Sequence, residues 1–317
     1  MPFPVITGSD LFGTFCVGSD NAWLVGFYSS IYHTANGGAS WQAQKSGTTA
    51  NLCDVFFADA QTGWICGRAG TMLNTTDGGA TWTAQSSTTK NHLFSMCFVD
   101  ETHGWAVGDF GTIIYTTDGG TTWAGQGPGE DRIYNDVSFA DRLNGWVVGE
   151  YGLIYHTVDG GKTWQKQECK EIIPVVDETE WEAFPPSLYS VFCRDTSTCW
   201  AAGMDGTVIM TSDSGETWKK IANPAEESKV TLYKIQVRGQ RGWAVGQKGT
   251  YLLSEDGGAT WHDSTRETNT RFWLRDLEFF DKMNGYAVGS RGTVLQTADG
   301  GRSWKMLSGI PLVRKSR

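Results

Sequence analysis

A tryptophan ends a short glycine-rich turn of the form (S/T)-x-D-G-G-x-(T/S)-W in seven related places along this 317-residue chain. These turns end at Trp41, Trp82, Trp123, Trp164, Trp218, Trp261 and Trp304. A second aromatic residue lies eighteen residues before each of them, at Trp23, Trp64, Trp105, Trp146, Trp200, Trp243 and Tyr286. Because both markers keep one spacing, we interpret the chain as seven copies of one supersecondary unit.

The unit itself predicts four short strands. In the third copy, apolar residues alternate over 93–100, and GWAVG (104–108), TIIYTTD (112–118) and TTWAGQ (121–126) follow, separated by turns. Four antiparallel strands per repeat of about 40 residues are typical of a propeller blade. An open β-solenoid would need capping segments at its ends, whereas the first and last units here are as complete as the others.

We therefore predict an all-β protein, a single seven-bladed β-propeller over residues 1–317 with four antiparallel strands per blade. The expected blades are 11–47, 51–88, 92–129, 133–169, 187–223, 230–266 and 273–309, with an insertion at about 170–186 between blades 4 and 5. Closure of the ring rests either on side-chain packing between the end blades or on pairing by residues 2–6. The sequence leaves both open.

The glycine-rich turn, an Asp box, is expected between the third and fourth strands of each blade. Its carboxylates are Asp77, Asp118, Asp159, Asp213, Asp256 and Asp299, with Asn36 in the first unit. An Asp can accept hydrogen bonds from its own loop, and the glycines allow positive φ. Each unit supplies one carboxylate, too few for a calcium site built by the protein. We expect a structural turn, no catalytic residue in it, and no metal or other cofactor.

The composition limits the classes of partner that the protein can bind. A formal charge of −9 argues against nucleic acid and against anionic membrane surfaces. The sequence has no run of eighteen apolar residues, so we expect no insertion into a membrane. The start of the sequence has no visible signal peptide, which suggests either a cytoplasmic protein or a trimmed, extracytoplasmic mature form. We expect a monomer.

Seven cysteines occur without metal-binding spacing. Cys16 and Cys193 occupy positions that hold Phe in other repeats, so we expect small buried thiols. Cys193 and Cys199 could instead pair across a hairpin in an oxidising compartment.

The turn between the second and third strands of each blade varies, although flanking glycines hold its geometry. Around the ring, Lys248, Arg291 and Arg68 lie on blades 6, 7 and 2, with Phe27 and Tyr28 on blade 1. Blades 3, 4 and 5 carry Asp109, Glu150 with Tyr151, and Asp205. These turns and the blade-to-blade connections lie on one face of the propeller. One half of this face should be basic and aromatic and the other half acidic.

Two connections between blades should add to the same face. The insertion brings Trp181 and Phe184 with several acidic residues, and the connection before blade 7 brings Arg271, Trp273 and Arg275. Surface loops tolerate scattered charge. Sorted charges together with loop tryptophans favour a binding surface for a partner instead.

The repeats at 95–123 and 279–304 resemble those of the bacterial-neuraminidase-repeat (Asp-box) proteins, and most closely the photosystem II stability and assembly factor family. The resemblance covers residues 11–307. It implies a non-catalytic propeller that binds another protein, a subunit of a membrane complex, through an arginine-rich patch. Arg68 and Arg291 match that patch, and Lys248 matches it less closely. Acidic Asp109, Glu150 and Asp205 in the equivalent turns depart from it.

The alternative is a glycan-binding or glycoside-hydrolase propeller of the sialidase type. Such an enzyme needs an arginine cluster and a tyrosine nucleophile with its carboxylate. Candidates are Arg68, Arg275, Arg291, Tyr28 and Glu150. The Phe-Arg-Ile-Pro motif of sialidases is absent, and xyloglucan hydrolases of this repeat class use two propellers. We therefore predict a protein that is not an enzyme, with sugar stacking on exposed aromatic side chains as a passive role.

Overall fold

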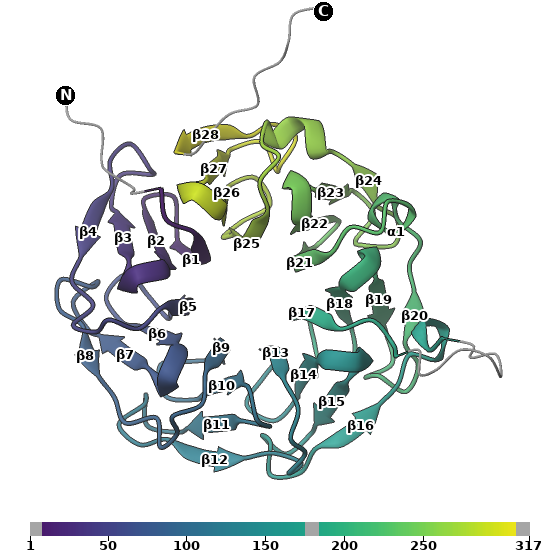
Figure 1. The fold of residues 1–317 in the computed structure, drawn as a ribbon, viewed down its shortest axis with the longest axis horizontal. Coiled ribbons are helices and arrows are strands. Elements are labelled where there is room, and N and C mark those ends of the chain that lie inside the picture. Colours follow the sequence, from purple (N-terminus) through teal and green to yellow (C-terminus); the bar gives the residue numbers. More distant parts are fainter. Residues whose placement is uncertain (1–7, 175–183, 309–317) are drawn as a thin grey trace, which may run out of the picture.

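A computed structural model describes residues 8–174 and 184–308 of the chain. Seven four-stranded antiparallel sheets stand around a central axis, each with its strands in sequence order from the centre to the rim (Figure 1). The prediction of an all-β, seven-bladed propeller is confirmed. No helix in the described segments is long and apolar enough to cross a membrane.

The strands fall into blades in chain order. Blade 1 holds β1 (Leu11–Val17), β2 (Asn21–Gly26), β3 (Ile31–Thr34) and β4 (Gln42–Gln44), and blade 2 holds β5 (Leu52–Phe57), β6 (Gly63–Gly67), β7 (Met72–Thr75) and β8 (Thr83–Ala84). Blade 3 holds β9 (Leu93–Phe98), β10 (Gly104–Gly108), β11 (Ile113–Thr116) and β12 (Ala124–Gln126), and blade 4 holds β13 (Tyr134–Phe139), β14 (Gly145–Gly149), β15 (Ile154–Thr157) and β16 (Gln165–Gln167). Blade 5 holds β17 (Leu188–Cys193), β18 (Cys199–Gly203), β19 (Val208–Thr211) and β20 (Lys219–Lys220). Blade 6 holds β21 (Leu232–Arg238), β22 (Arg241–Gly246), β23 (Tyr251–Ser254) and β24 (His262–Asp263), and blade 7 holds β25 (Leu274–Phe279), β26 (Gly285–Gly289), β27 (Val294–Thr297) and β28 (Lys305–Ser308).

Helical structure is confined to connections. The α-helix α1 spans Pro224–Glu227, and its N-terminal N–H groups are capped by the side chain of Asn223. Single 3-10 turns are η1 (Phe27–Ser29), η2 (Arg68–Gly70), η3 (Glu150–Gly152), η4 (Lys170–Ile172), η5 (Met204–Gly206), η6 (Gln247–Gly249), η7 (Thr265–Thr268) and η8 (Ser290–Gly292).

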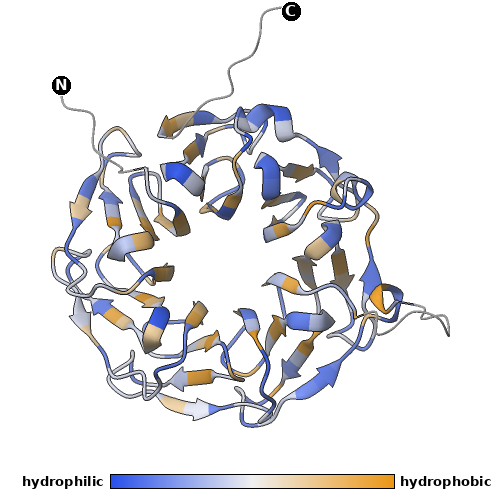
Figure 2. Ribbon diagram, viewed as in Figure 1, coloured by the Kyte–Doolittle hydropathy of each residue, from blue (hydrophilic) through white to orange (hydrophobic). Residues whose placement is uncertain are grey.

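The core lies between neighbouring blades. Every residue of the second strand is buried in blades 2, 3, 4, 5 and 7, as in β10. The outermost strands, such as β16 and β20, are hydrophilic and largely exposed (Figure 2). A blade thus packs both faces of its inner strands on its neighbours, which explains why those strands are continuously apolar and do not alternate.

At four blade interfaces the two aromatic markers of the repeat contact the same phenylalanine. The ring of Trp64 in blade 2 stacks on Phe98 in blade 3, with ring centroids 4.0 Å apart, and its Nε1 donates to the carbonyl of Gly119, 2.9 Å away. Trp123, which ends that Asp box, lies edge-on to Phe98 at 5.9 Å. The same stacking with a hydrogen bond to the next Asp box recurs at Trp23, Trp105 and Trp243. The constant spacing of the markers therefore reflects one repeated interface.

The Asp box closes on its own carboxylate. Asp118 accepts from the backbone N–H of Thr122 at 2.9 Å, from the Thr122 hydroxyl at 2.7 Å and from the Thr116 hydroxyl at 2.8 Å. These hydrogen bonds, with those from Thr122 first, lower the pKa of Asp118. Gly120 follows at φ 85°, and a Cβ there would collide with Gln85 of blade 2. The turn therefore needs glycine for its backbone, and a side chain there would also displace the amide of Gln85, which donates to the carbonyl of Gly119.

Blade 5 differs from the expectation of buried thiols, because Cys193 and Cys199 form a disulfide. They are directly opposite each other on β17 and β18. In blade 2 the corresponding pair is Phe57 and Gly63, where the phenyl ring lies over the glycine. The disulfide therefore takes the place of a ring against Trp146 of blade 4, in whose apolar cluster both cysteines lie. Sequence spacing alone could not show that the two thiols face each other.

Blades 1 and 7 meet without sharing a strand, since within the described residues each has four strands of its own. The backbone N–H of Thr14 in β1 donates to Asp276 of β25 at 2.7 Å, and Arg291 N donates to Asp10 at 2.8 Å. Tyr286 packs in one apolar cluster with Cys16. Side-chain packing thus joins the ends of the ring, and residues 2–6, the other candidate, lie outside the described residues.

Candidate binding face and central channel

The first strand of every blade carries a β-bulge near its start. In blade 2 the register shifts between Leu52 and Asp54, so that Cys53 is the additional residue, and the equivalent shift occurs in the other six blades. A bulge re-aims side chains and interrupts the alternation of a strand. Here two successive residues of the first strand, such as Cys53 and Asp54, line the central channel in five blades, and the bulge residue alone lines it in blades 1 and 5.

The residue at each bulge surrounds the mouth of the channel, on the side of the turns between second and third strands. We call this set the mouth ring: Phe12, Cys53, Phe94, Asn135, Tyr189, Tyr233 and Arg275. The guanidinium of Arg275 lies 5.1 Å from the centroid of the Tyr233 ring, and Tyr189 meets Tyr233 edge-on at 5.6 Å. The mouth is therefore aromatic over much of its circumference, with one cation stacked on it.

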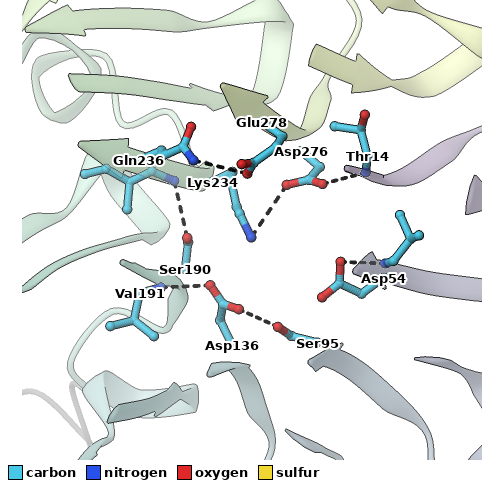
Figure 3. Close-up of polar contacts among 12 residues, drawn as sticks. Thr14, Asp54, Ser95, Asp136, Ser190, Val191, Lys234, Gln236, Asp276 and Glu278 are labelled. Atoms are coloured by element: carbon cyan, nitrogen blue, oxygen red, sulfur yellow. Dashed lines mark hydrogen bonds and ion pairs between the residues drawn. The ribbon is translucent and has the colours of Figure 1, made fainter. Parts of the chain in front are cut away.

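The next residue along each first strand forms an inner ring, drawn in part in Figure 3: Gly13, Asp54, Ser95, Asp136, Ser190, Lys234 and Asp276. Its carboxylates tie neighbouring blades together. Asp54 accepts from the backbone N–H of Met96 at 2.9 Å and Asp136 from that of Val191 at 2.9 Å. Asp276 accepts from Thr14 at the junction of blades 7 and 1, as described above. These contacts give the inner ring a structural role at three blade junctions.

Lys234 is the cation of the inner ring, and its Nζ lies 3.6 Å from Asp276 Oδ1 (Figure 3). Burial alone would lower the pKa of Lys234, but the charges of Asp136, Asp276, Asp54 and Glu278 outweigh burial and raise it. Burial raises the pKa of Asp54 to about 6, against the opposing effect of Lys234. Burial likewise raises the pKa of Asp276. The ring is thus an electrostatically coupled unit in which one ammonium faces several carboxylates.

The turns between second and third strands present their middle residue in the left-handed region of backbone space. This position has φ between 51° and 57° at Tyr28, Ala69, Phe110, Tyr151, Asp205, Lys248 and Arg291. Most residue types other than glycine avoid this region, and strained backbone often clusters at functional sites. The side chains project outward: Tyr28 is 79% exposed and Phe110 67% exposed.

The structure brings most of the basic and aromatic residues expected on blades 7 and 1 into contact. Arg291 and Arg271 lie 4.8 Å and 5.7 Å from the Phe272 ring centroid. Phe12 of the mouth ring joins two of the expected aromatic residues, because it stacks with Trp273 at 6.2 Å and meets Phe27 edge-on at 4.7 Å.

The basic residues of blades 2 and 6 have different surroundings. Burial raises the pKa of Cys53 to about 11, against the opposing effect of the charges of Arg275 and Arg68. Lys248 is exposed in its turn.

The half expected to be acidic is more mixed. Glu150 pairs with Arg132 at 3.7 Å, and that arginine also lies 5.7 Å from the Tyr151 ring. Tyr151 contacts Phe184 at 4.7 Å. Asp109 accepts from the backbone N–H of His92 at 2.7 Å, which engages its carboxylate in local structure. Asp205 is exposed, and Trp181 lies outside the described residues.

Sequence reasoning missed the mouth ring, apart from Arg275, and the whole inner ring. The sequence did contain one sign of the inner ring. The third residue of the first strand is polar in six of the seven repeats, although a simple alternating strand would place it on the same side as the apolar first residue. The bulges that turn this residue inward leave no such mark. Among residues 8–174 and 184–308, no group of three or more His, Cys, Asp or Glu side chains is arranged to hold a metal ion.

Solved structures with this fold include YCF48 proteins. A structure of YCF48 bound to D1 peptide is 19% identical, with a TM-score of 0.75 and 94% of each chain covered. YCF48 from Cyanidioschyzon merolae is 18% identical, with a TM-score of 0.73, and the match covers 93% of this chain and 97% of the other. An ancestral GH74 enzyme is 12% identical, with a TM-score of 0.72, and the match covers 96% of this chain but only 47% of that enzyme. At these identities the likeness shows the fold.

A comparison with curated proteins gives no match. The family model for photosynthesis system II assembly factor YCF48 matches residues 38–93, 84–177 and 174–269. Together these segments span residues 38–269, well over half of the chain. The chain therefore belongs to the family of the photosynthesis system II assembly factor YCF48.

Proposed function

We propose that the protein is a non-catalytic assembly scaffold that binds a polypeptide segment of a membrane-complex subunit. The binding surface is the face formed by the mouth ring, the turns between second and third strands, and the blade-to-blade connections. The observation that carries the proposal is the arginine and aromatic surface around the mouth, where Arg275 stacks on Tyr233 and Arg291 lies over Phe272.

Membership of an assembly-factor family supports a scaffold role. A protein with the same fold is described as YCF48 bound to D1 peptide, which supports a polypeptide as the ligand. Arginine and large aromatic side chains are the residues that most often dominate binding energy at protein interfaces. Around the mouth, Arg275 stacks on Tyr233, and exposed Tyr28 and Phe110 project from the variable turns, although the protein as a whole carries a net charge of −9.

The sorting of charge suggests which segment binds where. Arg68, Arg275 and Arg291 would attract an acidic stretch of the partner, and such charges mainly raise the association rate and set specificity. Tyr28, which is exposed, and Trp273, which is half-buried, lie on the neighbouring part of the face and would add contact area. A bound polypeptide would therefore lie with its acidic residues over blades 7 and 2.

We assign no catalytic role to the channel carboxylates. Asp54, Asp136 and Asp276 each accept a backbone N–H from the adjacent blade, so each has a structural task. A glycoside hydrolase would need a pair of carboxyl groups free to reach a sugar. A passive glycan contact at the exposed aromatic residues is the second candidate ligand, and it too requires no catalysis.

Reversal of charge around the mouth should abolish partner capture. We expect a variant with Arg68→Glu, Arg275→Glu and Arg291→Glu to retain less than a tenth of wild-type capture of membrane-complex subunits from detergent extracts of the native host. Its melting temperature should change little, because Arg68 and Arg291 are exposed and Arg275 is only half-buried. Capture is measured by affinity pull-down with quantitative mass spectrometry.

The matched control carries three equal reversals on the Asp-box face: Lys162→Glu, Lys219→Glu and Lys305→Glu, all at exposed positions. This control should capture the partner as the wild type does. Full capture by the mouth variant, or equal loss in both variants, would refute the assignment of the face.

A further inference from the structure

The junction between blades 4 and 5 differs from the four interfaces described above. In blade 2, Trp64 Nε1 donates to the carbonyl of Gly119 in the next Asp box. In blade 4, the equivalent Trp146 Nε1 donates instead to Oε1 of Gln167 in β16, 3.2 Å away. The next Asp box has Ser214 in the position of Gly119. The indole hydrogen bond of blade 4 therefore ends on a glutamine side chain and not on the backbone of blade 5.

The side-chain amide of Gln167 connects four groups at this junction. Its Oε1 accepts from Trp146 Nε1 and, at 3.0 Å, from Trp218 Nε1 of blade 5. Its Nε2 donates to the carbonyl of Ser214 at 2.9 Å and lies 3.3 Å from Nδ1 of His156 in β15. An indole N–H can only donate, so the amide must turn its oxygen toward the two indoles. Its NH2 group then points to Ser214 and His156.

His156 therefore accepts at Nδ1 and carries its proton on Nε2, because the bond made by one ring nitrogen sets the state of the other. The residue is 6% exposed, and its ring stacks on Trp146 with centroids 4.0 Å apart. Nε2 is buried and has no hydrogen-bond partner among the described residues. A second proton would go to Nδ1, where it would face the NH2 group of Gln167.

No charged group compensates for that second proton. Burial lowers the pKa of His156, and no charged neighbour in the described part of the chain contributes to the shift. Asp159 and Asp213, in the Asp boxes of blades 4 and 5, accept from hydroxyl and backbone groups of their own loops at 2.6–2.9 Å. Lys166 lies on the other side of β16 from Gln167, since successive side chains of a strand point to opposite faces. The disulfide of blade 5, in the same apolar cluster as the indole of blade 4, has no titratable proton.

We propose that His156 makes the junction of blades 4 and 5 sensitive to acid, because protonation of its ring and the hydrogen bonds of Gln167 to the two indoles exclude each other. A protonated ring can donate to Gln167 only if the amide turns over, and the amide then meets both indole N–H groups with its own NH2. A histidine whose pKa is lower in the folded state stabilises the fold fully above its unfolded pKa of about 6.5, and this contribution is lost as the pH falls. No residue of the mouth ring takes part, so the acid-sensitive junction is independent of the proposed function.

Blade 1 contains a matched histidine without this conflict. His33 lies in an identical IYHT segment, and its ring centroid is 4.5 Å from that of Trp23. Its Nε2 lies 3.2 Å from Oδ1 of Asn21, which can accept a ring proton, and the residue is half-buried. Burial lowers the pKa of His33 as well. A comparison of the two histidines therefore separates the effect of the glutamine from the effect of burial.

His156→Met tests the proposal, because methionine does not titrate and already occupies the equivalent position of blade 5, as Met210. Chemical denaturation gives the ratio of the unfolding equilibrium constants at pH 5 and pH 7.5. This ratio should be roughly three- to thirtyfold larger in the wild type than in His156→Met, the upper limit being a histidine that stays neutral while folded. His33→Met should lower the ratio less than His156→Met does. Equal ratios in the wild type and His156→Met, or an equal effect of the two substitutions, would overturn the proposal.

Exchange of indole N–H groups in the wild type keeps the test independent of whether the variant folds. The protection factors of the Trp146 and Trp218 Nε1–H groups, followed by NMR, should fall roughly threefold or more from pH 7.5 to pH 5. That of Trp123, whose Nε1 donates to the equivalent Gln85 at 3.2 Å, should stay within about twofold, because Asn74 occupies the histidine position there. Unchanged protection at Trp146 and Trp218, or an equal fall at Trp123, would also overturn the proposal.

Discussion

Lys234→Met should lower the free energy of unfolding at pH 7.5 by about 3–5 kcal/mol, the usual result of leaving buried carboxylates without their cation. The lysine side chain is 28% exposed, but Asp136 and Asp276 are buried. Methionine has a similar length and flexibility, so packing is largely retained. What is lost is the ammonium that faces Asp54, Asp136 and Asp276 across the channel. Those carboxylates would then be buried without a compensating charge, at the junctions where they hold neighbouring blades together. Chemical denaturation monitored by tryptophan fluorescence measures the change.

The effect of Lys234→Met should depend on pH in a defined direction. Asp54, Asp276 and Glu278 have raised pKa values in the folded protein, so the folded state binds more protons than the unfolded state as the pH falls. These groups therefore favour folding more at pH 5 than at pH 7.5, and without Lys234 their pKa values rise further. We expect the deficit of the variant to shrink toward pH 5.

Lys248→Met is the matched control, since this lysine is exposed in its turn and methionine would take the same backbone conformation. It should change stability by no more than about 0.5 kcal/mol. A Lys234→Met deficit that is equally small, or that grows toward pH 5, would show that the inner ring is not an electrostatically coupled unit.

Trp243→Ala should destabilise the protein by about 3–5 kcal/mol, because it removes a fully buried ring and leaves a cavity between blades 6 and 7. The indole stacks on Phe279 with centroids 3.7 Å apart, and its Nε1 donates to the carbonyl of Gly300 at 2.9 Å. One side chain thus contributes both apolar packing and a hydrogen bond to the next Asp box. The midpoint of denaturation, followed by circular dichroism, should fall accordingly.

Trp243→Phe separates the two contributions. It keeps an aromatic ring against Phe279 but removes the indole donor to the Gly300 carbonyl, which then accepts only from Arg241 Nη1, 3.0 Å away. Its cost should be clearly smaller than that of Trp243→Ala. Equal costs for the two variants would mean that the hydrogen bond, and not the stacking, determines the strength of the interface.

The fold could be predicted from the sequence because one physical interface is repeated. Trp64 must reach both Phe98 and Gly119 in the next blade, so the distance along the chain between the two aromatic markers cannot drift. The residues of the Asp box are constrained in the same way by their own hydrogen bonds. Such constraints leave a strict period, and a strict period of this length is typical of a propeller.

The channel could not be predicted because the bulges in the first strands leave no clear pattern. Simple alternation would place Cys53 and Asp54 on opposite sides of a strand, whereas the bulge turns both toward the channel. The contact of Lys234 with Asp276 also depends on the closure of the sheets into a ring. The disulfide between Cys193 and Cys199 depends on strand register, which spacing in the sequence did not determine.

The binding face could be predicted in part. The variable turns were visible as unlike dipeptides in one structural position, and Arg291 and Tyr28 do project from such turns. Which of these residues touch was not visible, because Phe12 of the mouth ring links Trp273 to Phe27 across the junction of blades 7 and 1. The pairing of Glu150 with Arg132, which makes the opposite half less acidic than expected, also required the structure.

Site-specific photo-crosslinking in the native host tests the binding face most directly. A benzophenone amino acid is placed at Tyr233 in the mouth ring, at Tyr28 in a variable turn, or at Lys162 in an Asp box, and the adducts are identified by mass spectrometry. The proposed binding face predicts adducts with a subunit of a membrane complex from Tyr233 and Tyr28 and none from Lys162. Adducts with such a subunit from Lys162 alone would contradict it.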